Sequence, residues 1–465
     1  MIVVLGGGLA GLGAGYTLAG SGVSLLLIEK EPSVGGLSRT VHHRGFRFDL
    51  GGHRFLTDSE ELRSLIKGLL GNELLTVRRR SKIFINGKYI DYPLRPLNAL
   101  TGLGPLNSVF MVADYLKEKL KVPFIGDGSD NDILNLEQWV VRNFGRRIFE
   151  LYFRDYSEKV WGRDCSEISK EWISQRINGL SLGSALKEAM LKRKNKGMRT
   201  LTDEFLYPSH GIGMIADRLK RAIEDKARIL TDSSVFEILH DGEMVREVAI
   251  LTREGLIRSE VDQLVSTIPL HALLDIMRPA PPAPVVEALE RLSYRHLILV
   301  TLFLERDQAT ELTWLYFPDK DLPFGRLHEP KNWSPYMAPE GRTHLVVEFF
   351  CSESDGLWSM SDEQLEGITM EALRGLGFFK SSEVMDALTM RIKNAYPIFD
   401  LAFRENLAVV EDYLKGFKNL FIVGRTGSFS YLNMDHALLS GMKAASEILR
   451  QNGTKEGSRK QCFLV

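Results

Sequence analysis

At the start of the chain stands Ile2-Val3-Val4-Leu5-Gly6-Gly7-Gly8-Leu9-Ala10-Gly11, the stretch that decides the fold. The four apolar residues predict a short buried strand, the glycines a tight turn, and the small residues up to about Ala19 a helix. Val23 to Glu29 predicts a second, parallel strand. This order of strand, turn, helix and strand is the βαβ unit with which a dinucleotide-binding domain often begins.

The spacing of the glycines adds a chemical reason to this prediction. In the pattern G-x-G-x-x-G, Gly6 makes the tight turn, Gly8 lets a pyrophosphate approach backbone N–H groups, and Gly11 lets the helix pack on the strand. Glu29 ends the second strand roughly 20 residues later, where a carboxylate accepts hydrogen bonds from ribose hydroxyls. A glutamate there disfavours NADP, so the pattern leaves NAD and FAD as the candidate cofactors.

Composition sets the broad class. The chain has 465 residues and 52.5 kDa, is 44% hydrophobic and 26% charged, and has a mean hydropathy of -0.09, which predicts a soluble globular protein of two or three domains. The net charge of -1 gives no reason to expect nucleic acid as a partner, and we expect no stable membrane insertion. The spacing of Cys165, Cys351 and Cys462 fits neither a metal site nor a disulfide framework, so we expect no metal and a cytoplasmic location.

The secondary-structure signals predict an α/β (mixed α+β) fold. A helix is expected near Glu60 to Leu70, and a hairpin between Lys82–Ile85 and Lys88–Ile90 that turns at Asn86-Gly87. The expected division is a discontinuous Rossmann-like domain from 1–57, 200–290 and 400–450, a mostly helical substrate or cap domain from 58–199, a β-rich substrate segment from 291–399, and a flexible tail from 451–465.

Three further stretches identify a superfamily. Val34–Thr40 with its Gly35-Gly36 doublet, Phe48–His53, and Phe421–Arg425 before a helix from about Asp435 resemble the protoporphyrinogen oxidase, amine oxidase and phytoene desaturase superfamily of flavoproteins. The resemblance covers nearly the whole chain and implies FAD as the cofactor. The FAD contacts that it implies are Gly6, Gly8, Leu9, Ala10, Gly11, Glu29, Lys30, Gly36, Leu37, Ser38, Gly51, Gly52, Val235, Gly424, Arg425 and Met434.

A narrower resemblance is to UDP-galactopyranose mutase, especially its eukaryotic form. It is carried by Gly51-Gly52-His53, Tyr156–Trp161 with Trp172 and Arg176, Trp314–Pro335, Tyr396-Pro397, and Tyr431 with Asn433–His436. It implies that reduced FAD, with NAD(P)H as a possible external reductant, attacks the anomeric carbon of a nucleotide sugar through N5 and so interconverts pyranose and furanose ring forms.

The mutase resemblance also implies a role for each site residue. His53 would face the flavin, and Arg176 and Arg326 would neutralise the diphosphate as charge develops on it. The substrate-binding residues that it implies are Tyr92, Trp314, Tyr316, Tyr396, Tyr431 and Asn433.

The chain departs from the mutase pattern at the end that would hold the base. Leu94 and Arg95 stand where the eukaryotic mutases carry an aromatic and an amide side chain, so another nucleotide sugar or another anionic substrate is also compatible with the sequence. Two alternatives stay open: an FAD-dependent oxidoreductase of the same superfamily, and a flavin-stabilised binding protein.

Overall fold

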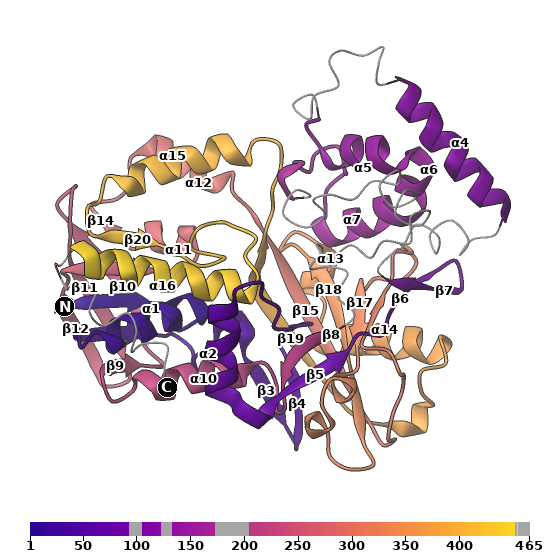
Figure 1. The fold of residues 1–465 in the computed structure, drawn as a ribbon, viewed down its shortest axis with the longest axis horizontal. Coiled ribbons are helices and arrows are strands. Elements are labelled where there is room, and N and C mark those ends of the chain that lie inside the picture. Colours follow the sequence, from indigo (N-terminus) through magenta and orange to yellow (C-terminus); the bar gives the residue numbers. More distant parts are fainter. Residues whose placement is uncertain (93–104, 122–132, 173–203, 452, 454–465) are drawn as a thin grey trace.

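The computed structural model describes residues 1–92, 105–121, 133–172, 204–451 and 453. The two largest β-sheets lie in the body of the molecule, and a group of helices projects from one end of it (Figure 1). The fold is a mixed α/β fold, as predicted.

The first sheet has five parallel strands in the order β20-β13-β1-β2-β9. Its strands are β1 (Ile2–Leu5), β2 (Leu25–Ile28), β9 (Ala227–Leu230), β13 (Gln263–Ser266) and β20 (Leu420–Ile422). Every residue of β1 and β2 is buried, which fits their uninterrupted apolar sequence, because a parallel sheet is covered on both faces. All five strands come from the three segments assigned above to the Rossmann-like domain.

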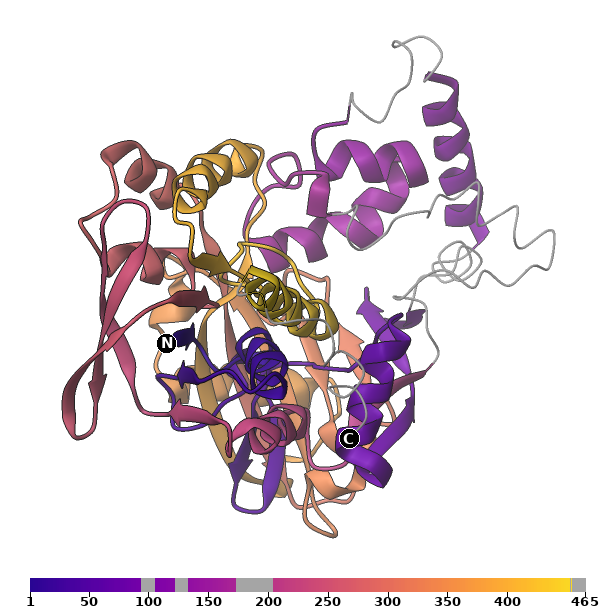
Figure 2. The same ribbon diagram turned by 60° about the vertical axis from the view of Figure 1, so that its left-hand side comes forward.

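Helices α1 (Leu9–Gly20), α10 (Gly213–Ile223) and α16 (Met434–Gln451) cover this sheet, and α1 contacts both of the others. Figure 2 shows α16 lying along α1. At this crossing the backbones touch, since a Cβ at Gly441 would lie 1.8 Å from the Ala10 carbonyl oxygen and one at Gly13 would lie 2.5 Å from that of Leu438. The small residues that predicted the first helix are therefore required by this packing.

The second sheet has seven strands in the order β19-β15-β18-β17-β16-β6-β7. Its strands are β6 (Ser81–Ile85), β7 (Lys88–Tyr92), β15 (Tyr294–Leu304), β16 (Trp314–Tyr316), β17 (Arg326–His328), β18 (Thr343–Cys351) and β19 (Val384–Pro397). β15 and β18 are buried along their whole length, so the middle of this sheet is core. The expected β6–β7 hairpin is present, and Asn86 (φ 50°) and Gly87 (φ 72°) make its turn.

The projecting helices are α4 (Pro105–Lys121), α5 (Leu136–Phe144), α6 (Arg146–Ile148) and α7 (Arg154–Trp161), and α7 contacts β18 of the second sheet. The predicted helix α2 (Glu60–Leu70) is capped by Ser59, whose side chain accepts a hydrogen bond from the Leu62 amide. The range 58–199 also contains β5 (Leu74–Arg78) and the β6–β7 hairpin, so part of the expected helical domain belongs to sheets. We keep the domain division as a proposal.

The remaining α-helices and the remaining strands, which belong to one four-stranded and two two-stranded sheets, complete the described fold. They are β3 (Thr40–His43), β4 (Phe46–Asp49), β8 (Glu204–Pro208), β10 (Ser234–His240), β11 (Val245–Thr252), β12 (Gly255–Glu260), α11 (Leu270–Asp275), β14 (Met277–Arg278), α12 (Ala283–Glu290), α13 (Gly356–Ser359), α14 (Asp362–Gly375) and α15 (Phe403–Lys415). Among the helices that the structure describes, none combines the length and the apolar character that crossing a membrane requires.

Candidate active site

The glycine turn between β1 and α1 has the shape that a pyrophosphate needs. Gly6 has φ +95°, and Gly8 precedes α1 without any side-chain cap on the first turn of the helix. A Cβ built at Gly8 would meet no atom within 4 Å, whereas one at Gly11 would lie 1.9 Å from the Gly6 carbonyl oxygen. Gly11 therefore packs helix on strand, and the open space beside Gly8 adjoins a helix N-terminus that attracts anions.

Glu29 lies beside this turn. The side chain is buried, and its oxygens accept the Gly7 amide at 2.7 Å and the Glu31 amide at 3.0 Å. The Ser233 amide donates to the Glu29 carbonyl at 3.0 Å and brings the half-buried Val235 into the same region. A carboxylate oriented by two amides keeps acceptor capacity for ribose hydroxyls, so the turn and Glu29 fit the adenosine diphosphate part of FAD.

Two other predicted FAD segments meet the turn. The Gly35 amide donates to the Gly7 carbonyl at 2.8 Å. Gly36 lies against Gly8, since a Cβ built on Gly36 would lie 3.2 Å from the Gly8 Cα. Gly424 (φ +82°) follows β20, and a Cβ on it would lie 3.0 Å from that of Ala10. Of the remaining predicted FAD residues, Leu37 is partly buried, Ser38 and Met434 are buried, and Lys30 is exposed.

The Gly51-Gly52-His53 loop touches the second sheet. The Gly52 amide donates to Glu348 Oε1 at 3.2 Å, and His53 Nδ1 lies 3.1 Å from the Gly51 carbonyl oxygen. Burial and then the charge of Arg425 lower the pKa of His53 to about 4, so its ring is neutral at pH 7. Trp314 is buried behind this loop, and a Cβ at Gly52 would lie 2.4 Å from its Nε1.

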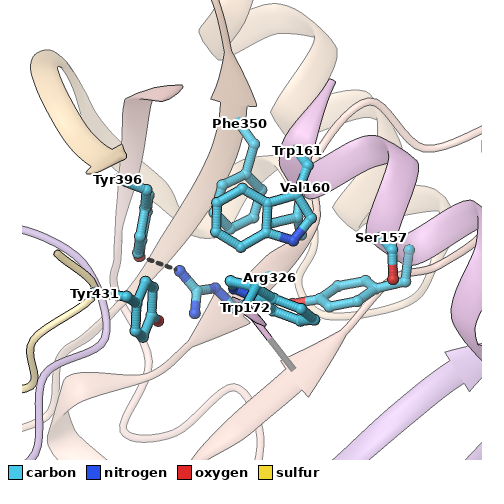
Figure 3. Close-up of a pocket in the computed structure, with 9 residues that line it drawn as sticks. Ser157, Val160, Trp161, Trp172, Arg326, Phe350, Tyr396 and Tyr431 are labelled. Carbon is cyan, nitrogen blue, oxygen red and sulfur yellow. Dashed lines mark hydrogen bonds between the residues drawn. The ribbon is translucent and has the colours of Figure 1, made fainter. Parts of the chain in front are cut away.

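A pocket lies between α7 and the second sheet (Figure 3). Its lining residues are Tyr156, Ser157, Val160, Trp161, Trp172, Arg326, Phe350, Tyr396 and Tyr431. The rings of Tyr396 and Tyr431 are stacked with their centroids 6.0 Å apart, and Arg425 lies 4.9 Å from the Tyr431 ring centroid. The pocket is thus walled by aromatic rings and holds the guanidinium of Arg326.

Strand register explains how Arg326 is held. Arg326 of β17 is the cross-strand partner of Glu348 on β18 and of Tyr316 on β16, so the three side chains share one row of the sheet. Arg326 Nη2 donates to the buried Glu348 carboxylate and, at 2.9 Å, to the Tyr396 hydroxyl (Figure 3). Within the described residues, Arg326 Nε and Nη1 donate to no protein atom.

The charges in this row stabilise one another. Burial is the largest single effect and acts to raise the pKa of Glu348, but Arg326, His328 and the Gly52 amide together outweigh it and lower that pKa to about 2. Burial likewise acts to lower the pKa of Arg326, while Glu348 holds it well above its ordinary value. His328 is buried 3.6 Å from Glu348, and burial lowers its pKa. At neutral pH the pocket is therefore lined by an Arg326 whose ionised partner Glu348 and the neutral His328 lie buried behind it.

The other predicted substrate residues lie around this pocket or outside the described residues. Tyr92 and Tyr316 pack with their ring centroids 4.6 Å apart, and burial raises the pKa of Tyr316. Asn433 is exposed, and its carbonyl accepts the Ala437 amide in the first turn of α16. Arg176, Leu94 and Arg95 lie outside the described residues.

Comparison with known proteins supplies the family. The sequence profile described as "Flavin containing amine oxidoreductase" matches residues 9–449. The chain belongs to this family. Membership implies FAD as the cofactor, in agreement with the cradle of glycines and Glu29.

Individual relatives include proteins of different named activities. Protoporphyrinogen oxidase 1 of Arabidopsis thaliana is 23% identical over 91% of this chain and 83% of its own length. A Klebsiella pneumoniae protein named "Probable UDP-galactopyranose mutase" is 22% identical over 98% of this chain and 96% of its own length. The solved structure of a reduced UDP-galactopyranose mutase superposes with a TM-score of 0.83 at 22% identity, covering 98% of this chain and 95% of that one. At these identities the likeness shows the shared flavoprotein fold.

Several residues in or beside the flavoprotein's pocket were not predicted as site residues. Glu348 is the clearest, and its signal in the sequence is a single carboxylate within the apolar run Leu345–Cys351. Phe350 lies two residues further along β18 and so shares its face. Trp161 and Lys159 stand within the Tyr156–Trp161 motif, but the motif does not show which side of the helix each occupies.

Proposed function

We propose that the protein is a flavin-dependent mutase that interconverts pyranose and furanose ring forms of a nucleotide sugar. The observation that carries this proposal is the Arg326 guanidinium, which lines the pocket while its Nη1 donates to no described protein atom. A guanidinium with open donors is suited to phosphate oxygens, which it binds through charge-assisted hydrogen bonds.

The groups around Arg326 support a diphosphate rather than an uncharged substrate. The hydroxyls of Tyr396 and Tyr431 add hydrogen-bonding groups on one side of the guanidinium, and Arg425 adds a second positive charge over the same two rings. Glu348 holds Arg326 in place from the buried side, so that binding a ligand costs little reordering of the arginine. Arg176 is proposed as a further diphosphate contact on the basis of the mutase resemblance.

The chemistry would be divided between cofactor and protein. When bound in its reduced form, FAD supplies the nucleophile for the anomeric carbon of the sugar. The protein binds the diphosphate leaving group at Arg326, keeps a neutral His53 beside the Gly51-Gly52 loop, and surrounds the sugar with the apolar faces of Trp161 and Phe350. Positive charge placed where the diphosphate develops charge stabilises the transition state.

A redox flavoenzyme is the second candidate. Six of the pocket's lining side chains are aromatic, and such walls also suit a flat organic substrate for oxidation. They are Tyr156, Trp161, Trp172, Phe350, Tyr396 and Tyr431. The protoporphyrinogen oxidases among the relatives favour the same possibility.

For either function we propose a cytoplasmic location, because Cys165 and Cys351 are buried free thiols. For a mutase we also propose NAD(P)H as the external reductant of the flavin.

Calorimetry with uridine diphosphate tests the proposal. Arg326→Ala is expected to weaken binding by roughly 2–4 kcal/mol, because a charge-assisted pair within the pocket is lost, and Arg326→Lys is expected to recover only part of it. Arg253→Ala is the matched control, because Arg253 is 74% exposed and pairs with Asp232 away from the pocket. Equal affinity of the wild type and Arg326→Ala would show that Arg326 is not the diphosphate site.

A further inference from the structure

Helix α7 forms one wall of the pocket and carries a lysine that points elsewhere. Ser157, Val160 and Trp161 of α7 line the pocket. Lys159, between them in sequence, instead reaches the segment Phe317–Phe324, which joins β16 to β17. That segment ends two residues before Arg326, which belongs to the opposite wall.

The Lys159 ammonium is surrounded by backbone oxygens of this segment. Its Nζ lies 2.7 Å from the carbonyl oxygens of Phe317 and Asp319, 2.8 Å from that of Leu322, and 3.2 Å from that of Phe324. An ammonium has three N–H donors, so all of them are used and the fourth carbonyl is held by charge alone. The four carbonyl dipoles point at one site, and without a cation there they would repel one another and lose their partners.

The segment is in turn joined to the strand beneath the pocket. The Phe317 amide donates to the Gly325 carbonyl at 2.9 Å, and the Gly325 amide donates to the Glu348 carbonyl at 2.9 Å. Arg326 is the first residue of β17. The backbone that leads into it is therefore held by the Lys159 contacts on one side and by β18 on the other.

A second cation holds the same C-terminal end of α7. Arg295 of β15 is buried and donates to the carbonyls of Val160 at 3.0 Å and Lys159 at 3.2 Å, and its Nη2 also donates to the Phe350 carbonyl at 3.0 Å. A Cβ at Gly162, just after α7, would lie 2.5 Å from this guanidinium. The end of the helix is thus attached to the sheet at one point by Arg295 and at another by Lys159.

We propose that Lys159 is a positioning residue that joins the α7 wall of the pocket to the Arg326 wall, and so sets the distance across which a substrate is bound. The residue contacts no substrate in this account. Its effect passes through the 317–324 segment to Arg326 and through α7 to Val160 and Trp161. The binding part of the inference rests on the proposed function, because it takes this pocket as the site of a nucleoside diphosphate.

The charge of Lys159 makes the strength of its contacts with the 317–324 segment depend on pH. Burial lowers the pKa of Lys159 to about 8, although Asp319, Asp155 and Asp321 act to raise it. The other charged groups that face this contact are Glu158 on α7, Lys320 in the segment and Arg295 on β15. As the pH rises through about 8, the ammonium loses a proton, and one N–H donor becomes a lone pair that faces carbonyl oxygens. This change weakens the contacts between Lys159 and the 317–324 segment.

Three variants of the FAD-loaded protein test the proposal. Lys159→Met removes the charge at similar length, and Lys159→Arg keeps a charge that does not titrate in this range. Lys320→Met is the matched control, because Lys320 joins the same segment to the same helix through Asp155 at 3.2 Å and Glu158 at 3.0 Å but is 61% exposed. The two readouts are amide hydrogen exchange of residues 317–325 and of α7 without ligand, and the affinity for uridine diphosphate from pH 7 to 9.5.

We expect Lys159→Met to speed exchange at the Phe317, Leu322 and Gly325 amides and to weaken uridine diphosphate binding by about tenfold or more, with Lys320→Met within about twofold of wild type. Wild-type affinity should fall with a midpoint near pH 8, and Lys159→Arg should abolish that fall. Unchanged exchange in Lys159→Met, or faster exchange with unchanged affinity, would overturn the proposal. If the wild type binds no uridine diphosphate, the proposed function fails, while the exchange comparison still decides whether Lys159 joins the two walls.

Discussion

Glu348 is the residue at which three parts of the candidate site meet. Its carboxylate accepts the Gly52 amide, pairs with Arg326, and lies 3.6 Å from His328. The side chain is fully buried, so its charge is tolerated only because these partners replace water. The carboxylate therefore orders both the loop expected beside the flavin and the cation expected beside the substrate.

Replacing Glu348 by glutamine should destabilise the protein, because the buried Arg326 charge loses its counter-ion. We expect a loss of about 3–5 kcal/mol at neutral pH, visible as a lower thermal midpoint in matched scans. The folded-state pKa of about 2 lies below the ordinary value of 4.5, so the stabilisation is complete above pH 4.5 and is lost as the pH falls through about 2. The difference between wild type and variant should therefore shrink in acid.

Glu353→Gln supplies the control for this prediction. Glu353 follows β18 and pairs with Lys393 at 2.6 Å, but both side chains are more than half exposed. No measurable shift in the thermal midpoint is expected for it. Equal midpoints for Glu348→Gln and Glu353→Gln at pH 7 would contradict the assigned role of Glu348.

At the scale of elements, substitutions in the turn from β1 to α1 should separate an effect on cofactor binding from an effect on stability. Gly8→Ala places a methyl group in open space and should leave the melting of the FAD-free protein unchanged, yet abolish FAD retention by filling the place of the pyrophosphate. Gly11→Ala meets the Gly6 carbonyl oxygen at 1.9 Å and should destabilise the FAD-free protein as well, by about 1–3 kcal/mol or more. Flavin absorbance and melting midpoint measure the two effects. Normal FAD content in Gly8→Ala would exclude this turn as the pyrophosphate site.

Glycine-to-alanine substitutions should change the stability in opposite directions at the crossing of α1 and α16 and at an exposed helix position. Gly441→Ala should destabilise the protein by more than about 2 kcal/mol, since its Cβ would lie 1.8 Å from the Ala10 carbonyl oxygen. Gly367 lies exposed within α14 with no atom within 4 Å of a built Cβ, so Gly367→Ala should stabilise the protein by about 0.5–1 kcal/mol. Denaturation midpoints of the two variants should move in opposite directions. A shift of the same sign in both would contradict the close crossing.

The elements also show what the sequence could predict. β1, α1, β2 and the β6–β7 hairpin were predicted because their signals are local: apolar runs, glycine spacing and an Asn-Gly turn. The parallel pairing of β6 with β16 could not be predicted, since it joins residues more than 200 positions apart and leaves no pattern in either strand. The Arg326–Glu348 pair depends in the same way on the register of β17 against β18.

At the scale of the whole molecule, the candidate site lies where three parts converge. The pocket's side chains come from α7 and Trp172, from β17, β18 and β19 of the second sheet, and from Tyr431 before α16, while the glycine cradle belongs to the first sheet. Sequence motifs identified the cradle, because its residues are nearly contiguous. The substrate side is assembled from segments distant in sequence, and for these residues a family resemblance was needed to suggest which tyrosines and arginines belong together.

The central claim is that this flavoprotein rearranges a nucleotide sugar without net oxidation. The most direct test reduces the protein once with dithionite under anaerobic conditions, adds UDP-galactopyranose and then a panel of other nucleotide sugars, and separates the ring forms by chromatography. We predict interconversion with many turnovers for each reduction, and none in the air-oxidised protein. Substrate-dependent oxygen consumption with a two-electron change in the product, and no ring-form interconversion, would contradict the account and favour the oxidoreductase.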